Sequence, residues 1–279
     1  MILITGANGQ LGTELRYLLD EQKQEYLATD AQNLDITDEV AVMEYFGLHR
    51  PTVVYHCAAY TAVDMAEDEG KELCYRVNEL GTQNIANAAK KYNALVVYIS
   101  TDYVFDGMLR DSEYDEESPT NPQNVYGDSK LKGELVLKAS GAKYYIIRTS
   151  WVFGQYGKNF VFTMQNLAQS RDTLTIVNDQ SGRPTWTRTL AEFMVHVVRT
   201  NQPQGIYHLS NDNSCSWFEF AKEILKNHPT VTVEPVTSQQ FVQKAKRPAH
   251  SIMSLEKAKA TGFAIPTWQD ALQRMLSEG

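Results

Sequence analysis

The chain has 279 residues, 43% of them hydrophobic and 22% charged, with a formal net charge of -8 at pH 7. This length and composition are those of a globular protein with a sizeable core. The acidic balance and the lack of any basic block exclude generic nucleic-acid binding, and no apolar run approaches the roughly 18 residues that a membrane span needs. We therefore expect neither a nucleic-acid partner nor a membrane partner.

The cysteines and histidines indicate the compartment and the metal content. Cys57, Cys74 and Cys215 are widely separated and form no C-x-x-C pair, which argues against a disulfide framework. The six histidines show no zinc-ligand spacing, and the strand-like first residues lack the features of a signal peptide. We expect a cytoplasmic protein that binds no metal.

The first half alternates apolar runs with helical patterns. Strands are predicted at residues 2–5, 25–29, 52–57, 95–100 and 144–148, and amphipathic helices near 11–22, 38–48, 71–92 and 128–139. The strands are apolar on both faces, as strands covered by helices on each side require. This alternation predicts an α/β fold with a Rossmann-type, doubly wound parallel sheet over residues 1–150.

The second half is less regular. Helical patterns near 158–169, 187–199, 216–227 and 267–277 are separated by short strand-like pieces at 205–209 and 231–235, with proline and glycine between them. We expect residues 151–279 to form mainly a smaller mixed α/β substrate domain, while segments at roughly 181–205 return to the first domain.

A glycine-rich turn follows the first predicted strand. The stretch TGANGQLG places Gly6, Gly9 and Gly12 at the spacing G-x-x-G-x-x-G. Gly6 allows a tight turn, Gly9 allows the backbone to approach a pyrophosphate, and Gly12 allows the helix to pack closely on the sheet. A dinucleotide cofactor, NADPH or NADH, is therefore expected here, in contact also with the intervening residues Asn8, Gln10 and Leu11.

Acidic residues after the second strand fit the same cofactor. Asp30 stands where a carboxylate bonds the adenosine ribose, and Asp35 and Ile36 are expected to reach the adenine in the next loop. The charge of Asp30 disfavours a 2′-phosphate and so favours NADH over NADPH. Arg16 is the only nearby cation in the sequence, and we expect it to face solvent.

A tyrosine and a lysine form the strongest chemical signal. Tyr126 and Lys130 are four residues apart on a predicted helix, so their side chains are neighbours. The ammonium is expected to favour the phenolate and lower the pKa of the phenol toward a useful range. Thr101 follows the fourth strand at the sheet edge where ligands bind; its hydroxyl either bonds a substrate carbonyl or satisfies the local turn.

These motifs resemble the extended short-chain dehydrogenase/reductase family and, within it, the dTDP-4-dehydrorhamnose reductase family. The narrower resemblance rests on blocks spread almost end to end: CAAYTAVD from residue 57, STDYVFDG from 100, RTSWVFG from 148, NDQSGRPT from 178, and Arg247-Pro248. It implies that a nicotinamide cofactor delivers hydride to C4 of a dTDP-linked 4-keto-6-deoxy sugar, forming dTDP-L-rhamnose for cell-surface polysaccharide.

The resemblance also implies roles for single residues. Tyr126 would protonate the developing alkoxide, Lys130 would lower its pKa and bind the ribose, and Thr101 would polarise the carbonyl. Asp102 either assists proton transfer or caps the turn, and Asn78 either supports the lysine through water or bonds backbone inside its helix. The loop after the third strand would line the cofactor through Ala58, Ala59 and Tyr60.

The implied sugar pocket is formed by Val63, Asp102, Tyr103 and Trp151, together with Thr101. Trp151 either offers an apolar face to the deoxyhexose or is a core aromatic. Arg247 is the natural partner of the substrate pyrophosphate because its planar guanidinium matches phosphate oxygens, and Arg183 competes for this role.

One position departs from the family pattern. Some members form dimers through a metal held by glutamates, one in the first helix and one in the helix after the Pro-Thr motif. Glu14 fits the first position, but Arg188 stands where the second acid is expected. A guanidinium repels a cation, so we predict no structural metal and a monomer or weak homodimer.

Two alternatives remain open at this stage. A nucleotide-sugar epimerase or dehydratase has the same fold, although dehydratases usually add an acid pair beside the threonine and only Asp102 is present here. A non-catalytic regulatory subunit, like the NADP-binding beta subunit of methionine adenosyltransferase, is the alternative from another class.

Overall fold

The computed structural model describes residues 1–278, and its centre is a six-stranded sheet. The strand order is β10-β5-β4-β3-β1-β2, and every neighbouring pair is parallel. The strands are β1 (Ile2–Thr5), β2 (Tyr26–Thr29), β3 (Val53–His56), β4 (Leu95–Thr101), β5 (Lys143–Thr149) and β10 (Gly205–His208). The predicted doubly wound α/β fold is confirmed, and the strand order changes direction at β1 and β3, where such sheets bind ligands.

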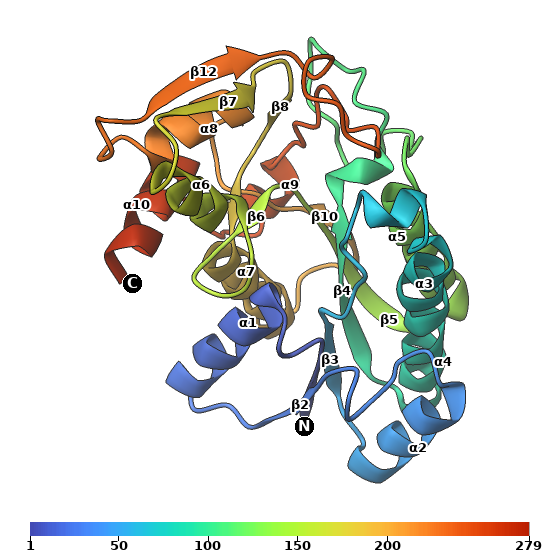
Figure 1. The fold of residues 1–279 in the computed structure, drawn as a ribbon. Helices are drawn as coiled ribbons and strands as arrows, with labels where there is room; N and C mark the ends of the chain where they lie inside the picture. The colour runs from blue at the N-terminus through green and yellow to red at the C-terminus, as the bar shows by residue number, and fades with distance from the viewer. Residues whose placement is uncertain (279) are drawn as a thin grey trace.

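Helices cover both faces of the sheet (Figure 1). One face carries α1 (Gln10–Glu21) and α7 (Thr187–Arg199), which bury Leu15 and Phe193 in one apolar core. The other carries α2 (Glu39–His49), α4 (Thr82–Tyr92) and α5 (Val125–Ser140), which bury residues such as Phe46 and Ile85 in a second core. None of the helices within residues 1–278 is long and apolar enough to cross a membrane.

The helix expected at 71–92 is divided into three segments. It consists of α3 (Lys71–Tyr75), a π-helical segment η2 (Arg76–Gly81) and α4. The side chain of Asn78, inside η2, accepts a hydrogen bond from Tyr60 N at 2.8 Å and donates one to Tyr60 O at 3.1 Å. The local change of helical pitch thus coincides with a contact to the loop after β3, which periodicity alone does not reveal.

The second half of the chain contributes to both parts of the molecule. Its α7 packs on α1, and its β10 completes the sheet beside β5. The remainder forms a smaller lobe with its own apolar core, which includes Phe153, Trp186, Phe220 and Trp268. This lobe contains β6 (Val152–Phe153), α6 (Phe160–Ala168), β7 (Thr173–Val177), β8 (Ser181–Gly182), β9 (Thr185–Trp186), β11 (Cys215–Ser216), α8 (Trp217–Ile224), β12 (Thr232–Val236) and α10 (Trp268–Glu278), while α9 (Glu256–Ala260) packs near β10.

Candidate active site

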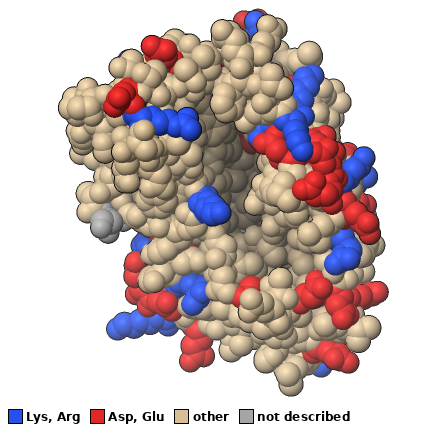
Figure 2. Space-filling model, in the orientation of Figure 1, with Lys and Arg blue, Asp and Glu red and all other residues tan. Residues whose placement is uncertain are grey.

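A cavity of about 650 Å³ lies over the ends of β1, β3, β4 and β5, between the sheet and the smaller lobe. The surface is hollowed between these two parts (Figure 2). The cavity collects most of the residues that the sequence singled out, from segments far apart in the chain. It is lined by Asn8, Gly9, Gln10, Leu11, Gly12, Ala59, Val63, Thr101, Asp102, Tyr103, Tyr126, Lys130 and Trp151, with others.

The glycine loop at the floor of the cavity fits a dinucleotide. Gly6 has φ +67°, and a Cβ there would lie 2.6 Å from the Ala58 backbone; a Cβ on Gly12 would lie 2.2 Å from the Gly6 carbonyl oxygen. Only glycine tolerates such contacts. Gly9 is the N-cap of α1 and provides no side-chain cap, so the first N–H groups of the helix can bind a phosphate. The buried Gln10 Oε1 also lacks a hydrogen-bond partner among the described residues.

Asn8 connects Asp30 with Arg16 at the edge of the loop. Asn8 Nδ2 donates to Asp30 Oδ2, and the Arg16 guanidinium donates to Asn8 Oδ1 at 3.1 Å. Arg16 therefore turns toward the loop and does not point into solvent, which corrects the expectation from the sequence. The reason is that Asn8, in the turn that precedes α1, offers its amide oxygen to the guanidinium. Asp30, the acid predicted to bind the ribose, thus has a cation nearby.

Besides Gly6 and Asp30, four predicted cofactor residues do not line this cavity. Asp35 Oδ1 instead accepts hydrogen bonds from the backbone and hydroxyl of Thr37. Ile36 is 6% exposed and belongs to the core below α4. Ala58 packs against Gly6, and the Tyr60 backbone is held by Asn78. For Asn78, the structure supports the backbone-bonding interpretation.

Tyr126 lies in the first turn of α5. The helix begins where Asn124 Oδ1 accepts from Gly127 N at 2.7 Å, an N-cap that fixes the position of the tyrosine. Tyr126 and Thr101 line the same cavity. Thr101 Oγ1 accepts from Tyr103 N at 3.2 Å and donates to Asp102 Oδ1 at 3.1 Å. Thr101 thus caps the local turn, and its bond to a substrate carbonyl stays a prediction.

The lysine does not lower the phenol pKa as expected. Burial raises the pKa of Tyr126, and the charge of Asp102 raises it further. Lys130 is 2% exposed, and its Nζ lies 4.0 Å from the centre of the Tyr98 ring. Burial lowers the pKa of Lys130 to about 7, against the opposing charge of Glu134. Exclusion of water therefore dominates both groups in the free protein.

Asp102 is a buried carboxyl at the cavity wall. It is 2% exposed, and its Oδ2 has no hydrogen-bond partner among residues 1–278. Burial raises the pKa of Asp102 to about 7, although Ser251 and Thr101 oppose this. The side chain that caps this turn is that of Thr101, so the structure does not assign the capping role to Asp102.

Trp151 forms the wall of the cavity opposite the sheet. Its ring stacks on Trp217, with centres 3.7 Å apart and planes at 11°. A Cβ on Gly182 would lie 2.6 Å from the Trp151 ring, so the indole is held on that side as well. The Tyr103 ring meets Tyr126 edge-on at 5.9 Å. Trp151 is half-buried and lines the cavity, which favours the pocket interpretation over a core aromatic.

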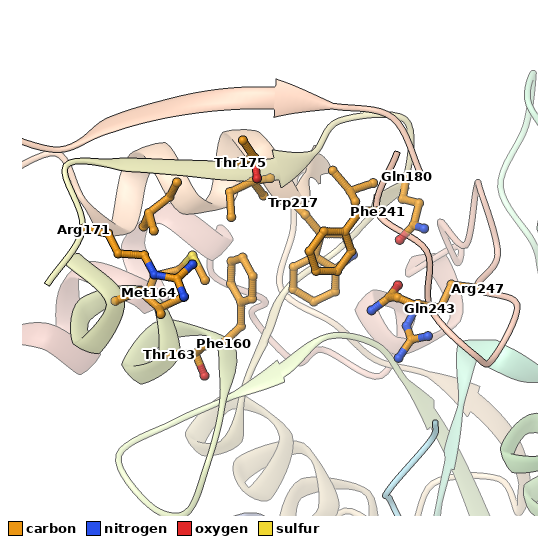
Figure 3. Close-up of a pocket in the computed structure, with 14 residues that line it drawn as sticks. Phe160, Thr163, Met164, Arg171, Thr175, Gln180, Trp217, Phe241, Gln243 and Arg247 are labelled. Atoms are coloured by element: carbon orange, nitrogen blue, oxygen red, sulfur yellow. The ribbon is translucent and has the colours of Figure 1, made fainter. Parts of the chain in front are cut away.

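A second cavity of about 500 Å³ adjoins the first and shares Phe160 and Trp217 with it. The rings of Phe160, Trp217 and Phe241 lie between Arg171 at one end and Arg247 at the other (Figure 3). The sequence analysis missed the three aromatic residues. One signal was available for Trp217, which directly follows Ser216, the N-cap of a capping box with Glu219.

The two candidate phosphate-binding arginines differ in position. Arg247 lines the second cavity and forms an ion pair with Asp64, with NH1 at 3.0 Å and NH2 at 2.7 Å from its oxygens. Arg183 pairs with Glu113 at 2.6 Å and donates to the Met253 carbonyl, and neither described cavity includes it. Its contacts are those of a structural residue.

Arg188 lies among acidic residues at the α1–α7 contact. Its guanidinium is 3.8 Å from Glu14 Oε1, 2.9 Å from Glu192 and 2.5 Å from Glu21. Thr187 donates to the other oxygen of Glu14 at 3.0 Å. A guanidinium thus lies beside Glu14, the one carboxylate that fits the family's metal-ligand pattern, and stands where the second acid is expected.

This parallel sheet with a glycine loop, and with Tyr126, Lys130 and Thr101 gathered at its carboxyl edge, defines a nicotinamide-dependent oxidoreductase of the short-chain dehydrogenase/reductase class. The family model described as RmlD substrate binding domain matches residues 1–279. The chain belongs to this family.

Individual relatives agree with this assignment. A dTDP-4-dehydrorhamnose reductase of Aggregatibacter actinomycetemcomitans is 40% identical over 98% of this chain and 97% of the relative. The spore coat polysaccharide biosynthesis protein SpsK of Bacillus subtilis is 38% identical over 99% of this chain and 97% of the relative. The crystal structure of a dTDP-4-dehydrorhamnose reductase from Bacillus anthracis in complex with NADP superimposes with a TM-score of 0.95, at 42% identity, over 100% of this chain and 99% of that one.

Proposed function

We propose that this protein uses NADPH or NADH to reduce the C4 keto group of dTDP-4-dehydro-6-deoxy-L-mannose, forming dTDP-L-rhamnose. The observation that carries the proposal is that one cavity combines the glycine loop, the side chains of Tyr126, Lys130 and Thr101, and the Trp151 wall. The chain's relatives named above include reductases of this sugar nucleotide. The product would serve polysaccharide synthesis.

The residues divide into two groups by position. Gly9, Gly12 and the first turn of α1 would hold the cofactor pyrophosphate, and Lys130 would hold the nicotinamide ribose. When bound, the reduced nicotinamide supplies the hydride. The deoxyhexose would lie between Tyr126 and Trp151, where an apolar indole face matches the 6-methyl side of the sugar.

The proton step belongs to Tyr126. As the C4 oxygen gains negative charge, the Tyr126 hydroxyl donates its proton to that oxygen, and the Thr101 hydroxyl would give up its bond to Asp102 to donate a hydrogen bond to it. The resulting phenolate is stabilised by the Lys130 ammonium on the same helix face. The high pKa of Tyr126 in the free protein keeps the phenol protonated before reduction.

The nucleotide would extend into the second cavity. The aromatic side chains of this cavity suit a pyrimidine ring, and Arg171 and Arg247 place positive charge at the two ends of the cavity. Arg247 would then exchange its contact with Asp64 for the diphosphate. We further propose that the protein acts in the cytoplasm as a monomer or weak homodimer, supported by three free cysteines and by Arg188 among the glutamates at α1 and α7.

The test is oxidation of NADPH and of NADH, followed by absorbance, with the dTDP-linked 4-keto sugar. Wild type is expected to oxidise at least one cofactor in a sugar-dependent manner, and Tyr126→Phe is expected to lose turnover by about 100-fold or more while retaining cofactor affinity. A folded protein that binds NADPH but oxidises neither cofactor with this sugar would support a non-catalytic subunit instead. Near-normal turnover by Tyr126→Phe would remove the tyrosine from the acid role.

A further inference from the structure

A buried ion pair lies one helical turn beyond Lys130 on α5. The Glu134 carboxylate accepts from Arg148 Nε at 2.9 Å and from Arg148 NH2 at 2.8 Å, and the two side chains are 0% and 3% exposed. Ser100 Oγ also donates to Glu134 Oε1, at 2.6 Å. Neither described cavity is lined by Glu134 or Arg148, so the mechanism above uses neither.

Stability alone explains this pair poorly. Burying two charges costs desolvation energy that their attraction regains only in part, and apolar residues of similar volume often serve equally well. Arg148 lies on β5 directly after Ile146 and Ile147, which are fully buried apolar residues. An apolar side chain at this position would continue the same pattern.

The position of Glu134 relative to Lys130 is informative. Residues four apart on a helix share a face, and the charge of Glu134 is the largest influence that opposes the burial of the lysine. Two bonds from Arg148 and one from Ser100 fix the carboxylate in place. The Lys130 ammonium packs on the Tyr98 ring, 4.0 Å from its centre.

The other titratable groups around Lys130 are uncharged at neutral pH. Burial raises the pKa of the neighbouring thiols and phenols and lowers that of the imidazole to about 3. Among the described groups that act on Lys130, Glu134 is therefore the one that carries a charge, and the Arg148 guanidinium bonded to it partly offsets that charge. The neutral groups are Cys57, on the loop after β3; Cys74, on α3; Tyr98, on β4; Tyr126, on α5; and His56, on β3.

We propose that Glu134 is a positioning residue for the reduction, whose charge keeps the buried Lys130 in its ammonium form and whose bond to Ser100 ties this helix to the strand that carries Thr101. The inference rests on the proposed reductase function. It assigns the ion pair a role through Lys130, since Glu134 touches neither cavity.

The consequence concerns the pH range of activity. Phenolate formation at Tyr126 requires the ammonium, so turnover falls as pH rises through the pKa of Lys130. Without the negative charge of Glu134 the neutral amine is favoured at lower pH. The alkaline limb of the pH profile therefore moves to lower pH in a variant that lacks this charge.

The experiment compares wild type with Glu134→Gln, measuring kcat against pH and, separately, NADPH affinity against pH without sugar. In Glu134→Gln both alkaline midpoints are expected to move to lower pH by about one pH unit. Glu134→Asp keeps the negative charge and is expected to stay close to the wild-type midpoints.

Because Glu134→Gln leaves Arg148 unpaired and threatens folding, a double variant with Arg148→Met removes both charges. A smaller displacement in the same direction is expected there, because loss of the Arg148 cation partly offsets loss of the carboxylate. Asp128→Asn, which removes a half-exposed charge from α5, is the matched control and should shift neither midpoint.

Failure of the proposed function and failure of the inference about Glu134 give different results. If wild type fails to reduce the sugar, the proposed function fails, but the pH dependence of NADPH binding still tests Glu134. If the folded single or double variant keeps the wild-type midpoints in both measurements, the inference about Glu134 is overturned whatever the reductase result.

Discussion

Asp102 offers a direct physical test of the cavity wall, because asparagine removes its charge with little change of shape. The carboxyl is 2% exposed, and its Oδ2 is unpartnered among the described residues. Asparagine resembles the protonated acid and can still accept the hydrogen bond that Thr101 donates. Asp102→Asn should therefore change the pH dependence of stability more than stability at acidic pH.

The magnitude follows from the pKa of Asp102, which burial raises from 3.8 to about 7. Between these values the folded protein holds a proton that the unfolded chain has released, so stability is fully present below pH 3.8 and is lost as pH rises toward 7. The full loss is about 4 kcal/mol, of which about 3 kcal/mol falls between pH 5 and 7.5. Because the carboxyl is buried, solvent does not screen its charge, and the whole difference in pKa contributes to the free energy of unfolding.

The assay is urea unfolding of wild type and Asp102→Asn at pH 5 and at pH 7.5. Other titrating groups cancel in the comparison, so the variant should gain about 3 kcal/mol relative to wild type on going from the lower to the higher pH. Equal pH dependence of the two proteins, within about 0.5 kcal/mol, would refute the account of Asp102 as a carboxyl whose buried charge is unfavourable.

Three further predictions concern the cofactor loop and the aromatic wall. Arg16→Met should raise the KM for NADPH by about tenfold and leave that for NADH within about twofold, because only the 2′-phosphate needs the cation; equal effects on both in steady-state kinetics would contradict this. Trp217→Ala removes the support of Trp151 and should raise the KM for the sugar nucleotide about tenfold with cofactor affinity unchanged, as measured by initial rates and NADPH fluorescence. Gly12→Ala places a Cβ 2.2 Å from Gly6 O and should abolish NADPH binding or folding, checked by fluorescence titration and circular dichroism; wild-type affinity would refute the close approach.

The central sheet was predictable because its signals are local. Each strand is a short run of Val, Ile, Leu or Tyr, and the helices between them repeat apolar residues at helical spacing, as Leu15, Leu18 and Leu19 do in α1. The roles of Gly6 and Gly12 could also be predicted from their spacing in the sequence. In the structure each meets backbone that only glycine tolerates. Thr101 could be placed at the ligand-binding edge because it ends β4, and Tyr126, in the first turn of α5, lines the same cavity.

Features that depend on contacts between distant segments were not predictable. The second cavity joins Phe160 on α6, Trp217 on α8 and Phe241 in a later loop, and no spacing links these residues. The environment of Arg16 depends on the rotamer of Asn8, and the pKa of Tyr126 depends on how completely the folded chain excludes water. Such properties belong to the packed structure.

Transfer of deuterium from reduced cofactor to sugar tests the central claim most directly. With NADPH or NADH dideuterated at nicotinamide C4, and the dTDP-linked 4-keto sugar, the account predicts dTDP-L-rhamnose with one deuterium at sugar C4, detected by NMR and mass spectrometry. Label at another carbon, or a product without label, would contradict the assignment of this cavity as a C4 ketoreductase site.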